Sequence, residues 1–271
     1  MTNAATSKIE QLINSRGGDI AYEGEGFVGT VRWNFDEEFE NDIRTLWELS
    51  NKAHEDWNSQ TAVFARAASA CDRGALSVRA EIERIKNGYI FKRRRIIKPL
   101  IKSGLLTRCE ERGGTLYITF KNEQIKRCLT KSGQVLEMAV YLFAHSAEDN
   151  GEKVYDDVMT GVVIDWDGEI LNSATDVRNE IDAIMIHKDV PVFVSCKSGA
   201  VDSNELYKLS VVAERFGGEK AKAVLISYAF GNTTHAQSLR NRAEEMNIKI
   251  VEYDFRTTEK EMTEKIKTLW V

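Results

Sequence analysis

The sequence predicts an α/β protein in two parts, a mostly helical N-terminal part followed by an α/β domain with a mixed central sheet. Two stretches carry this prediction. Residues 179–197 indicate two strands joined by a short turn, because residues 180–186 alternate, 187–190 carry turn chemistry and 191–194 form a second apolar run. Residues 221–229, AKAVLISYA, are continuously apolar, as in a strand buried inside an α/β sheet.

Composition narrows the class of protein. The 271 residues can hold two modest domains or one large one, and 42% hydrophobic with 29% charged residues is ordinary for a soluble globular protein. Apolar runs are too short to span a bilayer and no signal-peptide pattern is present, so we expect a cytoplasmic protein without a membrane partner. Four scattered cysteines without a CxxC pair indicate reduced thiols and no zinc site. The net charge of -5 argues against a uniformly basic nucleic-acid binder.

Residues 1–58 read as an N-terminal extension. The glycine-rich residues 1–36 indicate a small hairpin rather than a packed core, and the apolar spacing that follows indicates a helix. Trp33, Trp47 and Trp57 in this region could stack nucleobases. Packing in a core or on a dimer surface is the more common use of tryptophan, and both interpretations stay open.

Residues 59–128 follow the order helix, helix, helix and a two-stranded wing, which resembles a winged helix-turn-helix. The spacing predicts helices over Ser77–Lys86 and Phe91–Ser103. Leu105–Cys109 and Thr115–Phe120 are expected to form the hairpin. In proteins that this part of the chain resembles, such a module often serves as a connector and dimer element, and the resemblance therefore implies a homodimer.

The densest positive cluster of the chain, here called the basic run, lies in the second of these predicted helices. It could neutralise the phosphates of a nucleic acid, or it could be a solvated helix face. Its members are Lys92, Arg93, Arg94, Arg95 and Lys98.

Residues 129–271 are predicted to form the α/β domain. A first helix carries apolar residues around Glu137. The remaining elements alternate as expected for an α/β core. They are the strand Val154–Trp166, the two strands within 179–197, the helix Asn204–Phe216, the strand Ala221–Ala229, the helix Arg240–Met246, the strand Ile248–Tyr253 and the helix Glu259–Trp270.

Asp182 and Lys197 are the strongest candidates for chemistry. Asp182 lies on the first strand of the predicted hairpin and Lys197 ends the second, so the two side chains can lie side by side. A charged group in a mostly apolar sheet is costly unless it is paired or binds a metal. A buried ion pair is therefore the alternative to a catalytic pair.

These residues resemble the PD-(D/E)xK nuclease superfamily, whose members place an Asp on one strand and a (Glu/Asp)-x-Lys triplet on the next. Asp182 fits the first position and Lys197 the last, whereas Ser195 stands where an acid is expected. The resemblance extends from Lys131 to the C-terminus and is closer to one branch, the nucleases linked to cyclic-oligoadenylate sensor (CARF) domains in type III CRISPR defence. The matching segments are Gly161–Trp166, Asn179–Asp182 and Ser195–Gly199.

The resemblance implies a restriction-endonuclease-like α/β domain that uses Mg²⁺ or Mn²⁺, ions that prefer oxygen ligands. Asp182, the carbonyl of Cys196, Glu205 and Glu137 are the implied metal ligands, with Glu205 as the best replacement for the acid missing at Ser195. Lys197 is implied to act on the attacking water or the transition state. Glu180 is a further catalytic candidate and Lys208 a phosphate contact. For Glu205, Glu180 and Glu137 the alternative is a solvated carboxylate.

The expected function is a metal-dependent endonuclease that hydrolyses DNA or RNA in prokaryotic antiviral defence. One alternative is a nucleic-acid-binding or scaffolding protein with an inactive nuclease fold, with Ser195 as the lesion. Another is a restriction-type endonuclease. Residues 1–58 are too few for a CARF sensor domain, so we expect that domain to be missing and a regulatory partner to act in its place.

Overall fold

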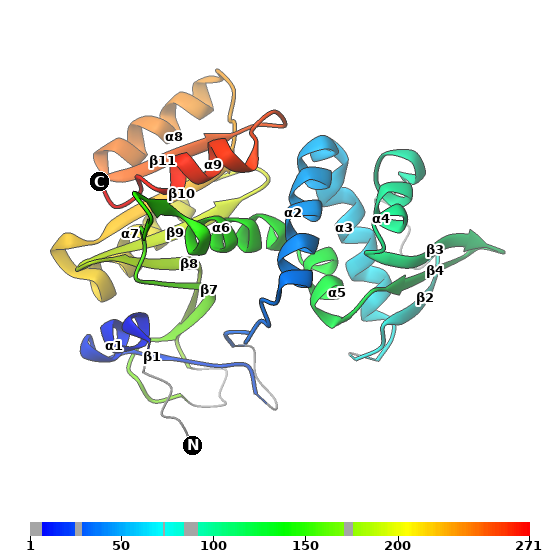
Figure 1. The fold of residues 1–271 in the computed structure, drawn as a ribbon, viewed down its shortest axis with the longest axis horizontal. Helices are drawn as coiled ribbons and strands as arrows, with labels where there is room; N and C mark the ends of the chain where they lie inside the picture. The colour runs from blue at the N-terminus through cyan, green and yellow to red at the C-terminus, as the bar shows by residue number, and fades with distance from the viewer. Residues whose placement is uncertain (1–6, 25–28, 73, 84–91, 171–175) are drawn as a thin grey trace. The chain divides into compact units, whose positions relative to one another are not determined.

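The computed structural model describes residues 7–24, 29–72, 74–83, 92–170 and 176–271. The chain divides into two compact units (Figure 1). The first unit combines Met1–Arg32 with Val140–Val271, and the second unit is Trp33–Ala139. Both contain helices and strands, so the protein is a mixed α/β protein, as the sequence predicts.

The first unit is built on a mixed six-stranded sheet with the order β1-β7-β8-β9-β10-β11. Neighbours from β1 to β9 are antiparallel, whereas β9, β10 and β11 are parallel. The change of direction follows from the connections, because a tight turn joins β8 to β9 while helices carry the chain between the parallel strands. The strands are β1 (Asp19–Ile20), β7 (Asp157–Asp165), β8 (Arg178–His187), β9 (Val190–Lys197), β10 (Lys222–Tyr228) and β11 (Ile248–Tyr253).

Helices from both ends of this unit share one apolar core with the sheet. Phe193 of the sheet and Phe216 of a helix are both fully buried in that core. The core contains residues of α1 (Lys8–Ser15), α7 (Ser203–Gly217) and α8 (Thr234–Glu245). The other elements of this half of the chain are α6 (Gln134–Ser146), which begins before the division between the units, β5 (Glu148–Asp149), β6 (Glu152–Lys153), the 3₁₀ helix η2 (Gly218–Lys220) and α9 (Glu259–Ile266).

The N-terminal segment differs from its prediction. We expected residues 1–36 to form a small hairpin without a packed core, and for the described residues this is wrong. α1 buries Ile9 and Ile13 completely in the core, and β1 pairs with β7. Ser7 and Glu10 form a capping box, which stabilises this short helix although few of its residues are apolar.

The second unit contains a three-stranded antiparallel sheet in the order β2-β4-β3. The predicted helix Ser77–Lys86 is wrong where it is described, because Ser77–Glu81 forms β2. Val78 and Ala80 are buried while their neighbours are exposed, which is the two-residue period of a strand. The later part of that prediction, from residue 84, lies outside the described residues.

The other helical and hairpin predictions for this unit are confirmed over the described residues. The predicted hairpin is the pair β3 and β4, and the second predicted helix is a π-helix followed by α4. The elements are α2 (Glu37–Lys52), α3 (His54–Ser69), β2 (Ser77–Glu81), the π-helix η1 (Arg93–Ile97), α4 (Lys98–Lys102), β3 (Leu106–Arg112), β4 (Thr115–Phe120) and α5 (Glu123–Thr130). Every helix in the described part of the chain is too short or too polar to span a lipid bilayer.

Candidate functional site

β8 and β9 separate from each other at the point where the predicted site residues lie. Their ladder runs from His187–Val190 to Ala183–Val194 and ends there. Beyond this point β8 still pairs with β7, and β9 still pairs with β10. A cavity of about 70 Å³, here called the strand cavity, opens beside the two separating strands and α7. Its lining is Asn179, Glu180, Ile181, Asp182, Val194, Ser195, Lys197, Glu205, Lys208, Leu209 and Val212.

Asp182 is held by the opposite strand. Its Oδ2 accepts a hydrogen bond from the backbone N–H of Cys196 at 2.6 Å and one from the hydroxyl of Ser195 at 3.3 Å. The Ser195 hydroxyl therefore orients the carboxylate of Asp182, and position 195 contributes no second carboxylate. The Asp182 side chain takes the place of a ladder contact, which explains why the strands separate here.

Gly161 of β7 lies next to Asp182 in the sheet, between the paired positions Thr160–Ala183 and Val162–Ile181. Its φ is 59°, a left-handed conformation that residues with a side chain rarely adopt. A Cβ at this position would lie 3.9 Å from a carboxylate oxygen of Glu180. That distance is an ordinary van der Waals contact, so glycine is favoured at this position by its backbone conformation and not by lack of space.

Lys197 and Glu205 form an ion pair, with Nζ and Oε2 2.9 Å apart. Lys208 lies 3.8 Å from the other oxygen of Glu205. Burial alone would lower the pKa of Lys197, but the hydrogen bond to Glu205 and the charges of Asp182 and Glu205 raise it above its ordinary value. The lysine therefore stays a cation at neutral pH.

α7 presents Glu205 because the helix begins beside the end of β9. Asp202 is its N-cap, and its side chain accepts from the N–H of Asn204 at 2.6 Å. This places Glu205 in the first turn. Glu205, Glu180 and Asp182 thus line one cavity together with the two lysines.

Other candidates from the sequence lie elsewhere. Glu137 belongs to the second unit, where its buried carboxylate accepts from Gln134 at 2.8 Å and lies 3.6 Å from the Lys131 ammonium. Trp47 and Trp57 are buried, so packing rather than nucleobase stacking explains them.

In the basic run, two cations are already paired within the second unit. Lys92 and Arg95 contact the two oxygens of Asp56 at 3.0 and 3.1 Å. Arg94 and Lys98 are exposed. The side chain of Arg93 lies outside the described part of the structure.

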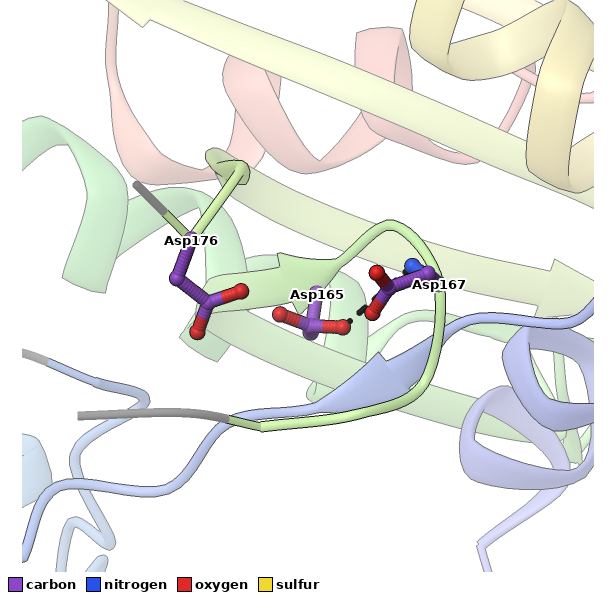
Figure 2. A group of neighbouring side chains, drawn as sticks. All are labelled: Asp165, Asp167 and Asp176. Carbon is purple, nitrogen blue, oxygen red and sulfur yellow. Dashed lines mark hydrogen bonds between the residues drawn. The ribbon is translucent and has the colours of Figure 1, made fainter. Parts of the chain in front are cut away.

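Three aspartates that the sequence analysis gave no role also come together, at the end of β7 (Figure 2). In this acidic cluster of Asp165, Asp167 and Asp176, one oxygen from each residue lies within 4.8 Å of the others. Asp165 is fully buried, and its Oδ1 accepts from the N–H of Gly168 at 2.8 Å. Arg178 forms an ion pair with Asp176 and lies 3.8 Å from Asp165. The sequence signal was three aspartates within twelve residues at the junction of two strands, a spacing that we did not interpret as a cluster.

Burial is the main cause that raises the pKa of Asp165, to about 6, and contacts with Asp176 and Asp167 raise it further against the opposing hydrogen bond from Gly168. Such a group of oxygen ligands could hold a metal ion. Among the described residues, the carboxylates of the strand cavity are not gathered this closely.

A mixed sheet that presents an aspartate, a lysine and further carboxylates where two strands separate has the groups of a metal-assisted hydrolase site. The family described as "Card1-like, endonuclease domain" matches residues 122–269, more than half of the chain. The chain belongs to this family. The match contains every residue that lines the strand cavity and all of the acidic cluster.

Solved structures show the same fold over nearly the whole chain. Protein VC1899 from Vibrio cholerae matches with a TM-score of 0.64 and 19% identity, over 96% of this chain and 59% of that one. Can2 from Sulfobacillus thermosulfidooxidans, solved in complex with cyclic tetra-adenylate, matches with a TM-score of 0.56 and 13% identity, over 97% of this chain and 60% of Can2. The chain thus spans less than two thirds of either protein. A search of curated protein sequences gives no match.

Proposed function

We propose that the chain is a metal-dependent endonuclease and that the strand cavity is its active site. The observation that carries the proposal is the placement of Asp182 and Lys197 on one cavity where β8 and β9 separate. Membership of an endonuclease family supports the reaction class. The two solved structures support only the fold, because their sequence identities are low.

Asp182 and Glu205 would hold Mg²⁺ or Mn²⁺, with the carbonyl of Cys196 as a further oxygen ligand. The donors fit such an ion, because Asp182 and Glu205 line one cavity and are both carboxylates. When bound, the ion would supply Lewis-acid stabilisation and a more acidic water. Glu180 lines the same cavity and is the next candidate ligand, whereas the contacts of Glu137 within the second unit favour a structural role.

The residues of the chain have separate tasks in this proposal. Ser195 and the N–H of Cys196 fix the orientation of Asp182. Glu205 holds the Lys197 ammonium beside the cavity, where its positive charge opposes the negative charge that develops on the phosphate. Lys208 is exposed next to the same cavity and would contact a neighbouring phosphate of the strand.

We further propose prokaryotic antiviral defence as the setting and a homodimer as the active form. The setting rests on the sequence resemblance to CRISPR-linked nucleases; Can2, which shares the fold, was solved in complex with cyclic tetra-adenylate. Control of this chain by a regulatory partner is part of the same proposal.

The test is cleavage of circular substrates, which have no ends and therefore report endonuclease activity alone. Circular single- and double-stranded DNA and circular RNA are incubated with the purified chain and Mn²⁺ or Mg²⁺. We expect linear products from at least one substrate and none in excess EDTA. Equal cleavage in EDTA would contradict the metal requirement. Binding without cleavage of any substrate would favour the inactive nucleic-acid-binding alternative.

A further inference from the structure

A second cavity lies in the second unit and is lined by two arginines. It has a volume of about 610 Å³, which falls in the range of small-molecule sites. We call it the arginine cavity. Arg66 of α3, Arg79 of β2 and Tyr117 of β4 line it, with Thr115, Ser69, Ala70, Cys71, Ala80 and Glu81.

Arg66 is the unusual member of this cavity. Its Nε and Nη2 are both buried, and within the described residues neither makes a hydrogen bond. A guanidinium is charged at every physiological pH and offers five N–H donors. Taking such a charge out of water is unfavourable unless an acceptor or an opposite charge compensates it. Arg66 as a whole is half-buried, and no ion pair reaches it from the described part of the chain, so an anion in the cavity would compensate the part of its charge that is shielded from water.

The surrounding groups suit an anion with several oxygens. Arg79 is paired with Tyr117 across the β2–β4 ladder and is exposed, so its charge is available at the same cavity. Hydroxyl groups of Thr115 and Tyr117 add donors around the two guanidinium groups, whereas the Ser69 hydroxyl donates to the backbone carbonyl of Arg66 at 2.9 Å. The described lining contains a single carboxylate, Glu81, against two arginines.

We propose that the arginine cavity binds a phosphate group of a nucleotide or of a nucleic-acid strand. Arginine binds phosphate through parallel N–H contacts, and the hydroxyls satisfy the remaining oxygens. The site is separate from the proposed endonuclease site, since it lies entirely in the second unit. It is also distinct from the basic run, whose Lys92 and Arg95 are engaged by Asp56.

The test measures binding and uses no cleavage, so it stands or fails apart from the proposed function. The unfolding temperature of the full chain is followed while inorganic phosphate replaces chloride at constant ionic strength. Because a ligand stabilises the state that binds it, we expect a saturable rise. In Arg66→Met the apparent affinity should fall about tenfold or more, which corresponds to the loss of a charge-assisted contact. Arg66→Lys should recover part of it.

Two further variants keep the result decisive. Arg79→Met removes the second, exposed guanidinium and should also weaken phosphate binding. It tests the site if Arg66→Met fails to fold. Arg256→Gln, an exposed arginine of the first unit, is the matched loss of one positive charge and should bind phosphate like the wild type. No saturable rise in the wild type, or an equal rise in both arginine variants, would overturn the proposal.

Competition assigns the source of the phosphate. Inorganic phosphate is displaced with AMP and, separately, with a single-stranded oligonucleotide without terminal phosphates. Displacement by AMP alone assigns a free nucleotide, and displacement by the oligonucleotide assigns a strand. If neither competes with phosphate, the assignment to nucleotide phosphates is wrong.

Discussion

Glu205 has two roles in the proposed site: it lines the strand cavity as a metal ligand, and it holds Lys197 in an ion pair. Glu205→Gln keeps its shape and removes its charge. We expect cleavage to fall by about 100-fold or more, as for other preorganised charges in active sites. Glu214→Gln, on the exposed side of the same helix, is the control and should cleave like the wild type. Wild-type rates in Glu205→Gln would leave Glu180 as the candidate carboxylate beside Asp182 in this cavity.

Asp165 predicts a pH dependence of stability. Its pKa is raised from 3.8 to about 6, so the folded protein binds this proton more tightly than the unfolded chain. The stabilisation is complete below the unfolded pKa and is lost as the pH rises through about 6. Asp165→Asn keeps an oxygen for the Gly168 N–H and removes the titration. The variant should therefore lose less stability than the wild type as the pH rises from 3.8 to about 6.

Urea unfolding at several pH values measures this difference. Asp189→Asn is the control. Lys220 holds the pKa of the exposed Asp189 below its ordinary value, and therefore below the pH range in which Asp165 changes stability. An identical pH dependence in wild type and Asp165→Asn would contradict the buried titration. If the acidic cluster binds a metal ion, added Mn²⁺ should remove the wild-type loss above that pH.

For single residues, the sequence predicts which side chains lie near the strand cavity but not the contacts that they make. Asp182, Lys197 and Glu205 were expected to lie near each other because strand ends and the following helix meet there, and they line one cavity, while their roles stay predictions. The contact between Ser195 and Asp182 depends on the separation of the strands, which no local pattern encodes. Spacing alone did not reveal the acidic cluster, because its assembly depends on the register of β7 and β8, which pairs Asp165 with Arg178.

Within the element β7, the backbone conformation at Gly161 requires a glycine. Because its φ of 59° is unfavourable for any residue with a Cβ, Gly161→Ala should destabilise the protein by about 1–2 kcal/mol. The new methyl group would lie 3.9 Å from the Glu180 carboxylate, an ordinary van der Waals contact, so Glu180 should keep its place and the cost should come from the backbone alone. Urea unfolding measures this loss of stability. Gly74→Ala is the control, with no atom within 4 Å of its Cβ position and no positive φ.

Elements were predictable where hydrophobic pattern and length agreed. β8, β9, α7, β10 and β11 all lie where periodicity placed them. The error at Ser77–Glu81 has a physical cause: SVRAE fits either period over five residues, and pairing with β4 decides in favour of a strand. α1 was missed because its burial against distant strands is a tertiary effect.

For the whole molecule, the basic run predicts a salt effect on nucleic-acid binding. Arg94 and Lys98 are its exposed members with described side chains. Reversing both to Glu should weaken binding and reduce the slope of log affinity against log salt, because fewer counterions are released. Reversing Lys153 and Lys188, two exposed lysines of the first unit, is the charge-matched control. Equal slopes in the two double variants would show that the basic run is only a solvated helix face.

The division into two units shows how much of the large-scale organisation could be predicted from the sequence. Residues 1–32 join the unit formed by residues 140–271, although they precede the second unit in the chain. Linear composition gives no sign of such a return, since it is the buried Ile9 and Ile13 that connect α1 to the sheet. The family match begins at residue 122 and does not include this segment.

The central claim is that phosphodiester cleavage occurs at the strand cavity and needs the charge of Asp182. The most direct measurement compares single-turnover cleavage of a circular substrate by Asp182→Asn and by Asp189→Asn, an exposed aspartate in the turn at the other end of the same hairpin. The account predicts cleavage by Asp189→Asn at the wild-type rate and a loss of about 100-fold or more in Asp182→Asn. Cleavage by Asp182→Asn at the wild-type rate would contradict it.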